Sequence, residues 1–324
     1  MKYHAARGPS FPQYALRDME HSEDRRETDM NILKHSDNNI SADNKGHRGE
    51  IFSLVGPLFL WMLLFLALPL VYVVIISFLE KGIYGGVQMI FTLENYTALW
   101  NPTYGKVIWR SIVLAFWTSL ICLLISYPFA FILSKFSKKY QGFCILLIML
   151  PFWINQLIRL NGWSNILRDS GTINTILLKL GIISEPITMM YTDGATLFGM
   201  VYALLPFMVL PLNNSISKLD ESLIEAAHDL GASRFSTFFR VILPLTLPGI
   251  FAGTIQVFIP SLDAFYIADV MGGGNSTLLG NLIKDQFMAA RNWPSGAAFS
   301  VILILFTLIV LKFYTKVGNL EDLA

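Results

Sequence analysis

Long apolar stretches constrain the fold of this chain more than any other feature of its sequence. The hydrocarbon core of a bilayer is about 30 Å thick, and a helix needs around 20 apolar residues to cross it. Six segments qualify, some of them with polar ends: 51–78, 111–134, 142 to about 158, 195–217, 248 to about 267, and about 295 to 311. All six contain or adjoin proline, which predicts bent helices. We therefore predict an all-α integral membrane protein with six transmembrane helices.

Composition supports the membrane class and excludes others. Hydrophobic residues make up 54% of the chain and charged residues only 15%, whereas a soluble domain carries about 25% charged residues. The formal net charge is +1, so no strong basic field points to nucleic acid as a partner. Cys122 and Cys144 both fall inside apolar runs, where a thiol behaves as a small hydrophobe. Neither a disulfide framework nor a metal site follows from them.

The first fifty residues differ from the rest of the chain. They are rich in charge, contain four of the five histidines and show almost no apolar clustering, so they cannot bury enough surface to offset the entropy of ordering. We predict a disordered cytoplasmic tail at 1–50, a transmembrane domain at 51–316 and a cytoplasmic tail at 317–324. The irregular spacing of the histidines favours a solvated tail over a metal site.

The distribution of Lys and Arg predicts the orientation of the chain in the membrane. Lys135, Lys138 and Lys139 follow the second apolar segment with no acid nearby, and Lys312 and Lys316 follow the sixth. Positive residues favour the cytoplasmic side, although several Lys and Arg also fall in the outer loops. We expect both termini to be cytoplasmic, and by alternation the polar loop 218–247 as well.

The loop 218–247 has the signals of two short helices. Asp220 is placed as an N-cap and Gly231 as a left-handed stop, which predicts a helix of about ten residues, roughly 15 Å long and too short to span a bilayer. Ser233 can cap a second helix, which we expect Pro244 to end before Pro248 opens the fifth span. From the residues alone, this loop either docks on another protein or rests on the membrane surface.

Three short blocks in this loop resemble a known signature. The sequence EAA at 225–227, a glycine four residues later and VILP at 241–244 are similar to the EAA motif of the membrane-spanning subunits of bacterial ABC importers, with Val241 where isoleucine is more common. In that family the loop forms the coupling helix that sits in a groove of a cytoplasmic ATPase. The resemblance assigns ATPase coupling to Glu225, Ala226, Ala227, Gly231, Ala232, Leu243 and Pro244.

The resemblance extends over about residues 51–316. The stretches FTLENYTALW (91–100), PFWINQLIRLNGW (151–163), GTINTILLKLGI (171–182), LLPFMVLPL (204–212) and FIPSLDAFYIADVMGGG (258–274) look like those of spermidine/putrescine permeases. The Arg-bearing end of the third span and the LPFMVLPL segment suggest the first of two dissimilar permease subunits. The implied fold is that of a type I ABC importer permease, in the bacterial cytoplasmic membrane.

The resemblance also implies a division of labour between several proteins. The chain contains nothing like G-x-x-x-x-G-K-[ST], so we expect no ATP hydrolysis by this subunit and no cofactor bound to it. ATP and Mg would bind a separate ATPase, present in two copies. The further implied partners are a second permease subunit, an extracytoplasmic polyamine-binding protein and the lipid bilayer.

A few polar and aromatic residues near the spans are candidates for the substrate pathway. A carboxylate within a membrane is costly, so Asp263 is expected to face a cavity or a partner. Asp263 and Asp269 could supply counter-charge to a polycation, with Tyr266 and Trp153 offering cation–π surface. The alternative is that Asp263 pairs with Arg159. Because a cation there would repel a polyamine, we expect Arg159 to have a gating or structural role.

Two other functions remain open from the sequence. The permease could carry another small solute, such as an iron complex or a sulfonate, and the choice between spermidine and putrescine is also open. An ion-driven secondary transporter would be expected to show paired ionisable groups within the membrane and an inverted repeat. Asp263 stands nearly alone and no repeat is evident, which favours the ATP-driven class.

Overall fold

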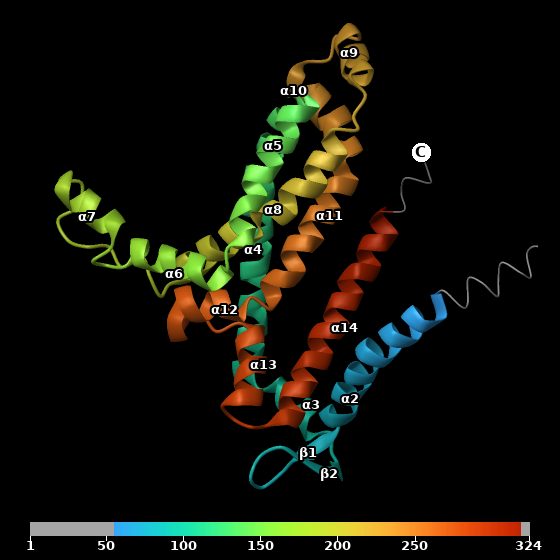
Figure 1. Cartoon of the computed structure of the whole chain (residues 1–324), viewed down its shortest axis with the longest axis vertical. Helices are drawn as coiled ribbons and strands as arrows, with labels where there is room; N and C mark the ends of the chain where they lie inside the picture. The colour runs from blue at the N-terminus through green and yellow to red at the C-terminus, as the bar shows by residue number, and fades with distance from the viewer. Residues whose placement is uncertain (1–54, 319–324) are drawn as a thin grey trace, which may run out of the picture. The chain divides into compact units, whose positions relative to one another are not determined.

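A computed structural model of the protein describes residues 55–318 (Figure 1). The predicted tail 1–50 and nearly all of the predicted tail 317–324 lie outside the described residues. The chain divides into two compact units, with the boundary between Val71 and Tyr72. Each unit is described by itself.

The first unit contributes most of one apolar helix. The candidate span Val55–Ser77 includes a π-helical stretch, η1 (Leu63–Ala67), followed by α2 (Leu68–Ser77), which continues into the second unit. The span agrees with the segment expected at 51–78, because a continuous run of apolar side chains is sufficient to specify a membrane helix.

The second unit begins with a β-hairpin. Strands β1 (Leu79–Lys81) and β2 (Val87–Phe91) pair antiparallel and are followed by α3 (Glu94–Thr97) and the 3₁₀ turn η2 (Ala98–Trp100). The buried Asn95 amide donates to the carbonyls of Ser77 and Leu79 at 3.1 and 2.8 Å, and the Ser295 hydroxyl donates to Asn95 Oδ1 at 3.3 Å. The hairpin is thereby tied to the start of the last helix. The pattern of apolar residues in the sequence did not predict this hairpin.

Three long helices form the centre of the second unit. The helices α4 (Pro102–Ser134), α8 (Asp193–Ile216) and α11 (Leu243–Leu262) pack against one another. Fully buried side chains in and around them include Cys122, Leu160, Met200, Met208, Leu212, Val257 and Met271. Hydroxyl groups also join the helices, since Tyr127 OH and Thr246 Oγ1 lie 2.9 Å apart. These helices hold the remaining segments in place.

Helices α8 and α11 approach closely at two glycines. A Cβ atom at Gly253 would lie 2.6 Å from Met208 Sδ, and one at Gly249 would lie 2.9 Å from the Pro211 carbonyl oxygen. Neither position has room for a side chain, and small residues of this kind allow membrane helices to pack backbone against side chain. The contact fixes the register of α11 against α8.

The third apolar segment is broken, contrary to the single span expected at 142 to about 158. Helix α5 (Lys138–Met149) and η3 (Leu150–Trp153) end before Ile154, and α6 (Gln156–Leu167) leaves at an angle, with the whole pair bent by 89°. The Asn155 side chain accepts a hydrogen bond from the Leu157 amide at 2.8 Å and so starts the new helix. Helix α6 continues into α7 (Thr172–Lys179), and both leave the bundle sideways (Figure 1). Arg159 therefore lies beyond the break.

The fifth span also differs from the expected one. Helix α10 (Arg234–Thr237), the π-helical turn η4 (Phe238–Ile242) and α11 form one candidate span, Arg234–Leu262. The prediction that Pro244 ends a separate helix is wrong: Pro244 lies in the first turn of α11, where a missing N–H costs little. The span ends at Leu262, before Ile267, and short elements follow: α12 (Phe265–Ile267), η5 (Ala268–Gly272) and η6 (Gly273–Asn275).

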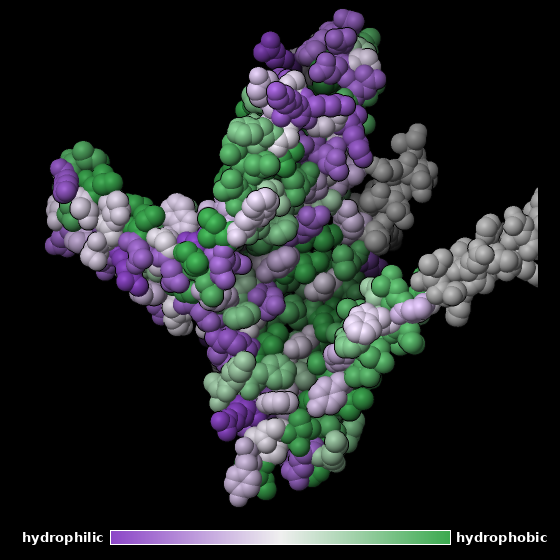
Figure 2. Space-filling view, in the orientation of Figure 1, coloured by the Kyte–Doolittle hydropathy of each residue, from purple (hydrophilic) through white to green (hydrophobic). Residues whose placement is uncertain are grey.

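The last helices of the described residues are α13 (Leu279–Met288) and α14 (Trp293–Gly318). The described residues contain five helices long and apolar enough to cross a membrane, or six if the bent third pair counts as one span. Within the second unit, α9 (Glu221–Asp229) lies at one end, the loop end, and the hairpin lies at the opposite end, the hairpin end (Figure 1). Hydrophilic residues gather over α9 and α10, and hydrophobic residues follow along the helices below them (Figure 2).

Candidate functional site

The loop end carries the short helix that the sequence predicts. The Asp220 carboxylate accepts a hydrogen bond from the Ser222 amide at 3.0 Å, and hydrogen bonding to Ser222 lowers the pKa of Asp220. Gly231 has φ +81° just after α9, in the left-handed region that favours glycine. Asp220 and Gly231 therefore mark the beginning and end of α9 as expected.

The residues of the EAA motif occupy an open surface. Glu225, Ala226 and Gly231 are exposed, while Ala227 and Ala232 are half-buried. Their small side chains leave the backbone of α9 accessible to a flat or grooved partner surface. The other two residues assigned to coupling, Leu243 and Pro244, lie on the continuous helix that α9 precedes.

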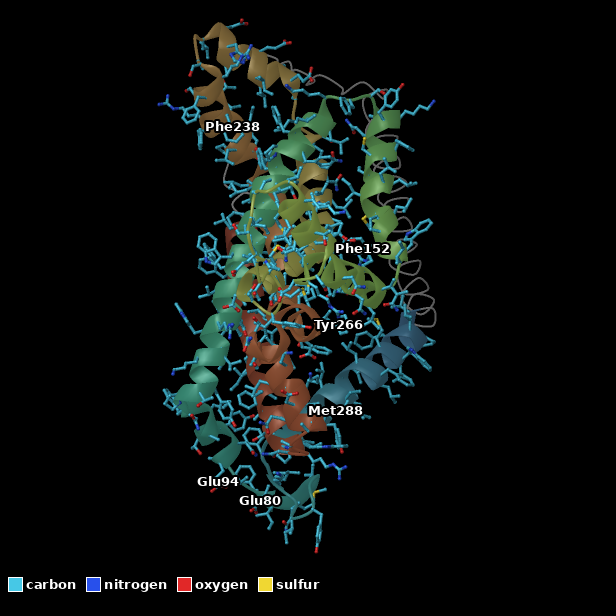
Figure 3. All side chains as sticks on the ribbon, turned by 90° about the vertical axis from the view of Figure 1, so that its left-hand side faces the viewer. Glu80, Glu94, Phe152, Phe238, Tyr266 and Met288 are labelled. Atoms are coloured by element: carbon cyan, nitrogen blue, oxygen red, sulfur yellow. The ribbon has the colours of Figure 1, made fainter. Side chains whose placement is uncertain are left out.

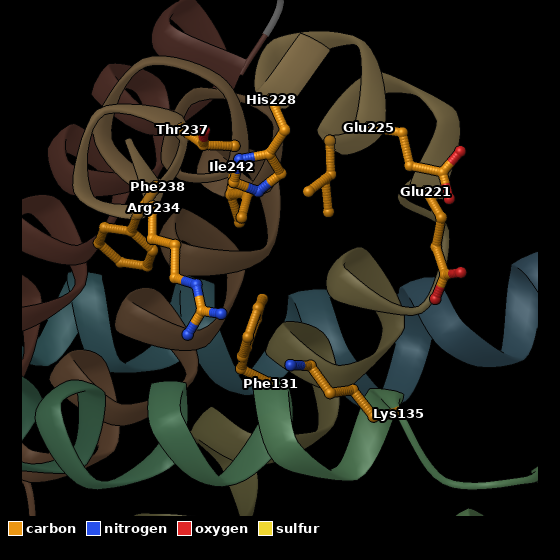
Figure 4. Close-up of a pocket in the computed structure, with 10 residues that line it drawn as sticks. Phe131, Lys135, Glu221, Glu225, His228, Arg234, Thr237, Phe238 and Ile242 are labelled. Carbon is orange, nitrogen blue, oxygen red and sulfur yellow. The ribbon is translucent and has the colours of Figure 1, made fainter. Parts of the chain in front are cut away.

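A pocket of about 530 Å³ lies between α9, α10 and the end of α4 (Figure 4). Its apolar lining comes from Phe131, Ile224, Phe238 and Ile242, and its charged lining from Lys135, Glu221, Glu225, His228 and Arg234. Lys135 and Arg234 extend toward the Phe131 ring, with Lys135 Nζ 4.9 Å from its centroid, while both glutamates lie on the other side of the pocket (Figure 4). The pocket therefore separates α9 from the end of α4.

A second region forms between the loop end and the hairpin end, where two helices are interrupted. The chain breaks after η3 at Ile154 and again after α11 at Asp263, and α6 contacts η5, which follows the second break. Phe152 and Tyr266, one beside each break, lie at mid-height between Phe238 and Glu80 (Figure 3). Interrupted helices of this kind expose backbone polar groups, and in transporters they line ligand sites near the bilayer centre.

Asp263 lies at the end of α11, beside Gly280 of α13. Its side chain is exposed, and in the described part of the chain it forms no ion pair. The alternative pairing of Asp263 with Arg159 is therefore not present in this structure. A carboxylate without a partner at a helix break is suited to attract a cation.

Asp269 is in a different situation, because it already has partners. Its carboxylate accepts hydrogen bonds from Lys284 Nζ at 2.6 Å and from the Asn281 amide at 2.5 Å. The hydrogen bond and the negative charge of Asp269 raise the pKa of Lys284. Asp269 is consequently neutralised by this chain, which weakens the prediction that it supplies counter-charge to a substrate.

The aromatic candidates differ in exposure. Trp153 is 87% exposed at the first break, whereas Tyr266 is half-buried against the core. Arg159 lies over two rings, with its guanidinium carbon 4.9 Å from the centroid of Phe152 and 5.5 Å from that of Tyr202. Phe152 and Tyr202 were not predicted from the sequence as site residues. Phe152 adjoins Trp153 in the PFW triplet, but Tyr202 sits within an apolar helix with no local signal.

Comparison with known proteins identifies the family of this chain. Residues 51–318 match the family described as "Binding-protein-dependent transport system inner membrane component". The chain belongs to this family. It is thus a multi-pass membrane protein and a component of a transport system, with the permease fold of an ABC importer.

Individual relatives agree with this assignment. The chain is 46% identical over 261 residues to the "Spermidine/putrescine transport system permease protein PotB" of Haemophilus influenzae, covering 80% of this chain and 91% of the relative. It is 44% identical over 270 residues to the protein of the same name in Escherichia coli K12, covering 83% and 97%. Among solved structures, a bacterial ABC transporter involved in alginate import matches with a TM-score of 0.69 at 16% identity, covering 84% and 96%. At that identity the match supports the fold alone.

Proposed function

We propose that this chain is a permease subunit of an ATP-driven importer of polyamines and that α9 couples it to a separate ATPase. The strongest support for the cargo is the identity of 44 to 46% to two permeases named for spermidine and putrescine transport, over four fifths of the chain. The strongest support for coupling is the shape of the loop end. There a capped, exposed helix stands beyond the long helices and carries the EAA residues.

The geometry suggests how motion would pass from the ATPase to the spans. Helix α10 is continuous with α11 through η4, so a displacement of the loop end acts directly on a helix that reaches Leu262. Beyond Leu262 lies Asp263, at the second break. A rigid helix that connects a docking surface to a helix break is a suitable element for switching access between the two sides of a membrane.

The remaining partners follow from the same proposal. A second permease subunit would complete the pathway, a cytoplasmic ATPase in two copies would bind ATP and Mg, and an extracytoplasmic binding protein would deliver the polyamine. Both termini of this chain and the loop end would face the cytoplasm, and the hairpin end would face outward. The binding protein would carry much of the choice between spermidine and putrescine.

Uptake by the reconstituted complex tests the cargo. The chain is co-expressed with its second permease, ATPase and binding protein, and uptake of labelled spermidine is measured with unlabelled putrescine or an amino acid as competitor. We expect ATP-dependent uptake that putrescine reduces and the amino acid does not. Uptake that proceeds without the ATPase would indicate an ion-driven transporter, and the absence of spermidine uptake would reject the polyamine cargo.

Substitutions in α9 test the coupling. Glu225→Arg reverses a charge on the docking surface, and Gly231→Leu forces a side chain into a backbone with φ +81°. Each is expected to lower substrate-stimulated ATP hydrolysis severalfold while the subunit is still expressed. Glu185→Arg, on the exposed segment between α7 and α8, and Gly142→Leu, where a Cβ meets open space, serve as matched controls. Undiminished hydrolysis in the assembled variants would rule out coupling through α9.

A further inference from the structure

Arg159 is a half-buried cation whose guanidinium has two buried nitrogen atoms without a hydrogen-bonding partner. Among the described residues, its Nε and Nη1 atoms are buried and donate to no acceptor, and no carboxylate forms an ion pair with it. Water normally compensates such N–H groups, and a buried guanidinium in a protein is usually held by a carboxylate or by carbonyl oxygens. Its environment must therefore stabilise the charge in another way.

Aromatic rings provide that environment. The guanidinium carbon lies 4.9 Å from the Phe152 ring centroid and 5.5 Å from that of Tyr202. Further rings extend the group, which we call the ring cluster: Phe152 packs on Phe207 at 5.4 Å, Tyr202 on Trp163 at 5.5 Å, and Trp163 on Phe198 at 4.8 Å. Ring faces attract cations, and groups of rings around a cation are a recurrent way to recognise ammonium ions.

The location of the ring cluster connects it with the proposed pathway. Phe152 lies in η3, at the end of the third span, and Arg159 lies in the first turns of α6, just after the break. Helix α6 in turn contacts η5, beyond the break that carries Asp263. A cation attracted by the Asp263 carboxylate would thus meet the ring cluster in the same part of the bundle, at mid-height (Figure 3).

We propose that the ring cluster is an ammonium-binding subsite and that the guanidinium of Arg159 occupies it at rest. The proposal rests on the polyamine transport proposed above and adds a specific subsite to it. Two cations cannot share the same ring faces without repulsion, because a half-buried site screens charge less than bulk water does. A substrate ammonium group therefore enters only when α6 moves and withdraws Arg159. Until α6 moves, the positive charge of Arg159 prevents other cations from binding to the subsite.

Equilibrium binding in the absence of the binding protein tests this inference. Labelled spermidine is titrated into the complete membrane complex of two permeases and ATPase in nanodiscs, by scintillation proximity. Arg159→Met removes the competing charge and leaves a shorter, unbranched apolar side chain, and we expect it to bind spermidine about five- to tenfold more tightly than wild type. Arg159→Lys keeps the charge and is expected to bind as weakly as wild type. Arg159→Gln provides a second uncharged variant, which retains hydrogen-bond donors if the methionine variant is unstable.

A double substitution tests whether the tighter spermidine binding depends on the ring cluster. Adding Phe152→Leu to Arg159→Met removes one ring face and is expected to return binding to the wild-type level, with thermal midpoints of all variants recorded for comparison. Unchanged or weaker binding by both uncharged variants would overturn the inference and point to a structural clamp. Equally tight binding by Arg159→Lys, or a gain that survives Phe152→Leu, would also overturn it. If the wild-type complex takes up spermidine but the uncharged variants do not bind it more tightly, the subsite proposal fails and the proposed function stands. If wild type takes up none, the proposed function fails.

Discussion

At the residue scale, three charged side chains near the helix breaks have different neighbours. Asp269 is held by Lys284 and Asn281, and Arg159 lies over the rings of Phe152 and Tyr202. Asp263 has no ion-pair partner among the described residues. A charge that is already paired contributes to the structure, whereas a charge without a partner near a membrane interior usually serves a ligand or a partner. Of these three residues, we therefore expect Asp263 to interact with the transported cation.

The first prediction concerns the charge of Asp263. Asp263→Asn keeps the size of the side chain and removes its charge, so an ammonium group passing the second break loses its counter-charge. A partly exposed ion pair is worth up to about 1 kcal/mol, and we expect labelled spermidine uptake at low substrate to fall by up to about fivefold while ATP hydrolysis changes less. Asp169→Asn, an exposed position between α6 and α7, is the control. Equal losses of uptake and hydrolysis would instead indicate a structural role.

At the element scale, the same residue types have opposite effects in different places. Pro151 lies in a 3₁₀ turn after which Asn155 starts a new helix, so the chain turns sharply there. Pro244 follows a π-helical turn and begins α11 without interrupting the span. The helix ends at Ile154, three residues after Pro151, where the backbone leaves the helical region, whereas Ile242 and Leu243 before Pro244 keep helical backbone angles. Ile154, with ψ 136°, is extended.

The second prediction concerns the contact between α8 and α11. Gly249→Leu would place a side chain against the Pro211 carbonyl oxygen, which belongs to the backbone of α8 and cannot move aside. Overpacking of this kind typically costs about 1–3 kcal/mol or more. We expect a lower thermal midpoint and poorer assembly of the purified complex. Gly142→Leu, in open space on α5, should leave both unchanged. A normal midpoint for Gly249→Leu would show that the two helices are farther apart than described.

At the scale of the whole second unit, the three central helices connect a polar loop end to a hairpin end. The hairpin end is fixed by contacts between distant parts of the chain, in which Asn95 binds the carbonyls of Ser77 and Leu79 and accepts from Ser295. Arg110 adds a second such connection by pairing with Asp193 and thus joining α4 to the start of α8. The hairpin end is therefore well suited to remain fixed while the loop end moves.

The third prediction concerns that fixed end. Asn95→Ala removes the donor to two carbonyls and the acceptor for Ser295, and leaving buried polar groups without partners costs about 1–3 kcal/mol each. We expect the thermal midpoint of the purified complex to fall by several degrees. Gln88→Ala, an exposed amide on β2, is the matched control and should have little effect. A midpoint equal to that of wild type would show that Asn95 does not stabilise the hairpin end.

Local features of the sequence were sufficient to determine the membrane class, most of the spans and the boundaries of α9. A run of apolar residues or a cap such as Asp220 acts through its own segment, so no tertiary contact is needed to recognise it. The family signature in the loop end was recognisable for the same reason.

Only the tertiary structure decided the chemistry at the breaks. The pairing of Asp269 with Lys284 and the placement of Arg159 against Tyr202 depend on residues distant in the chain. Such contacts leave no periodic or local pattern, because they arise where packed helices bring unrelated segments together. The sequence by itself therefore determined the membrane class, most of the spans and the two ends of α9. The packing of those helices decided which charges are paired and which remain available.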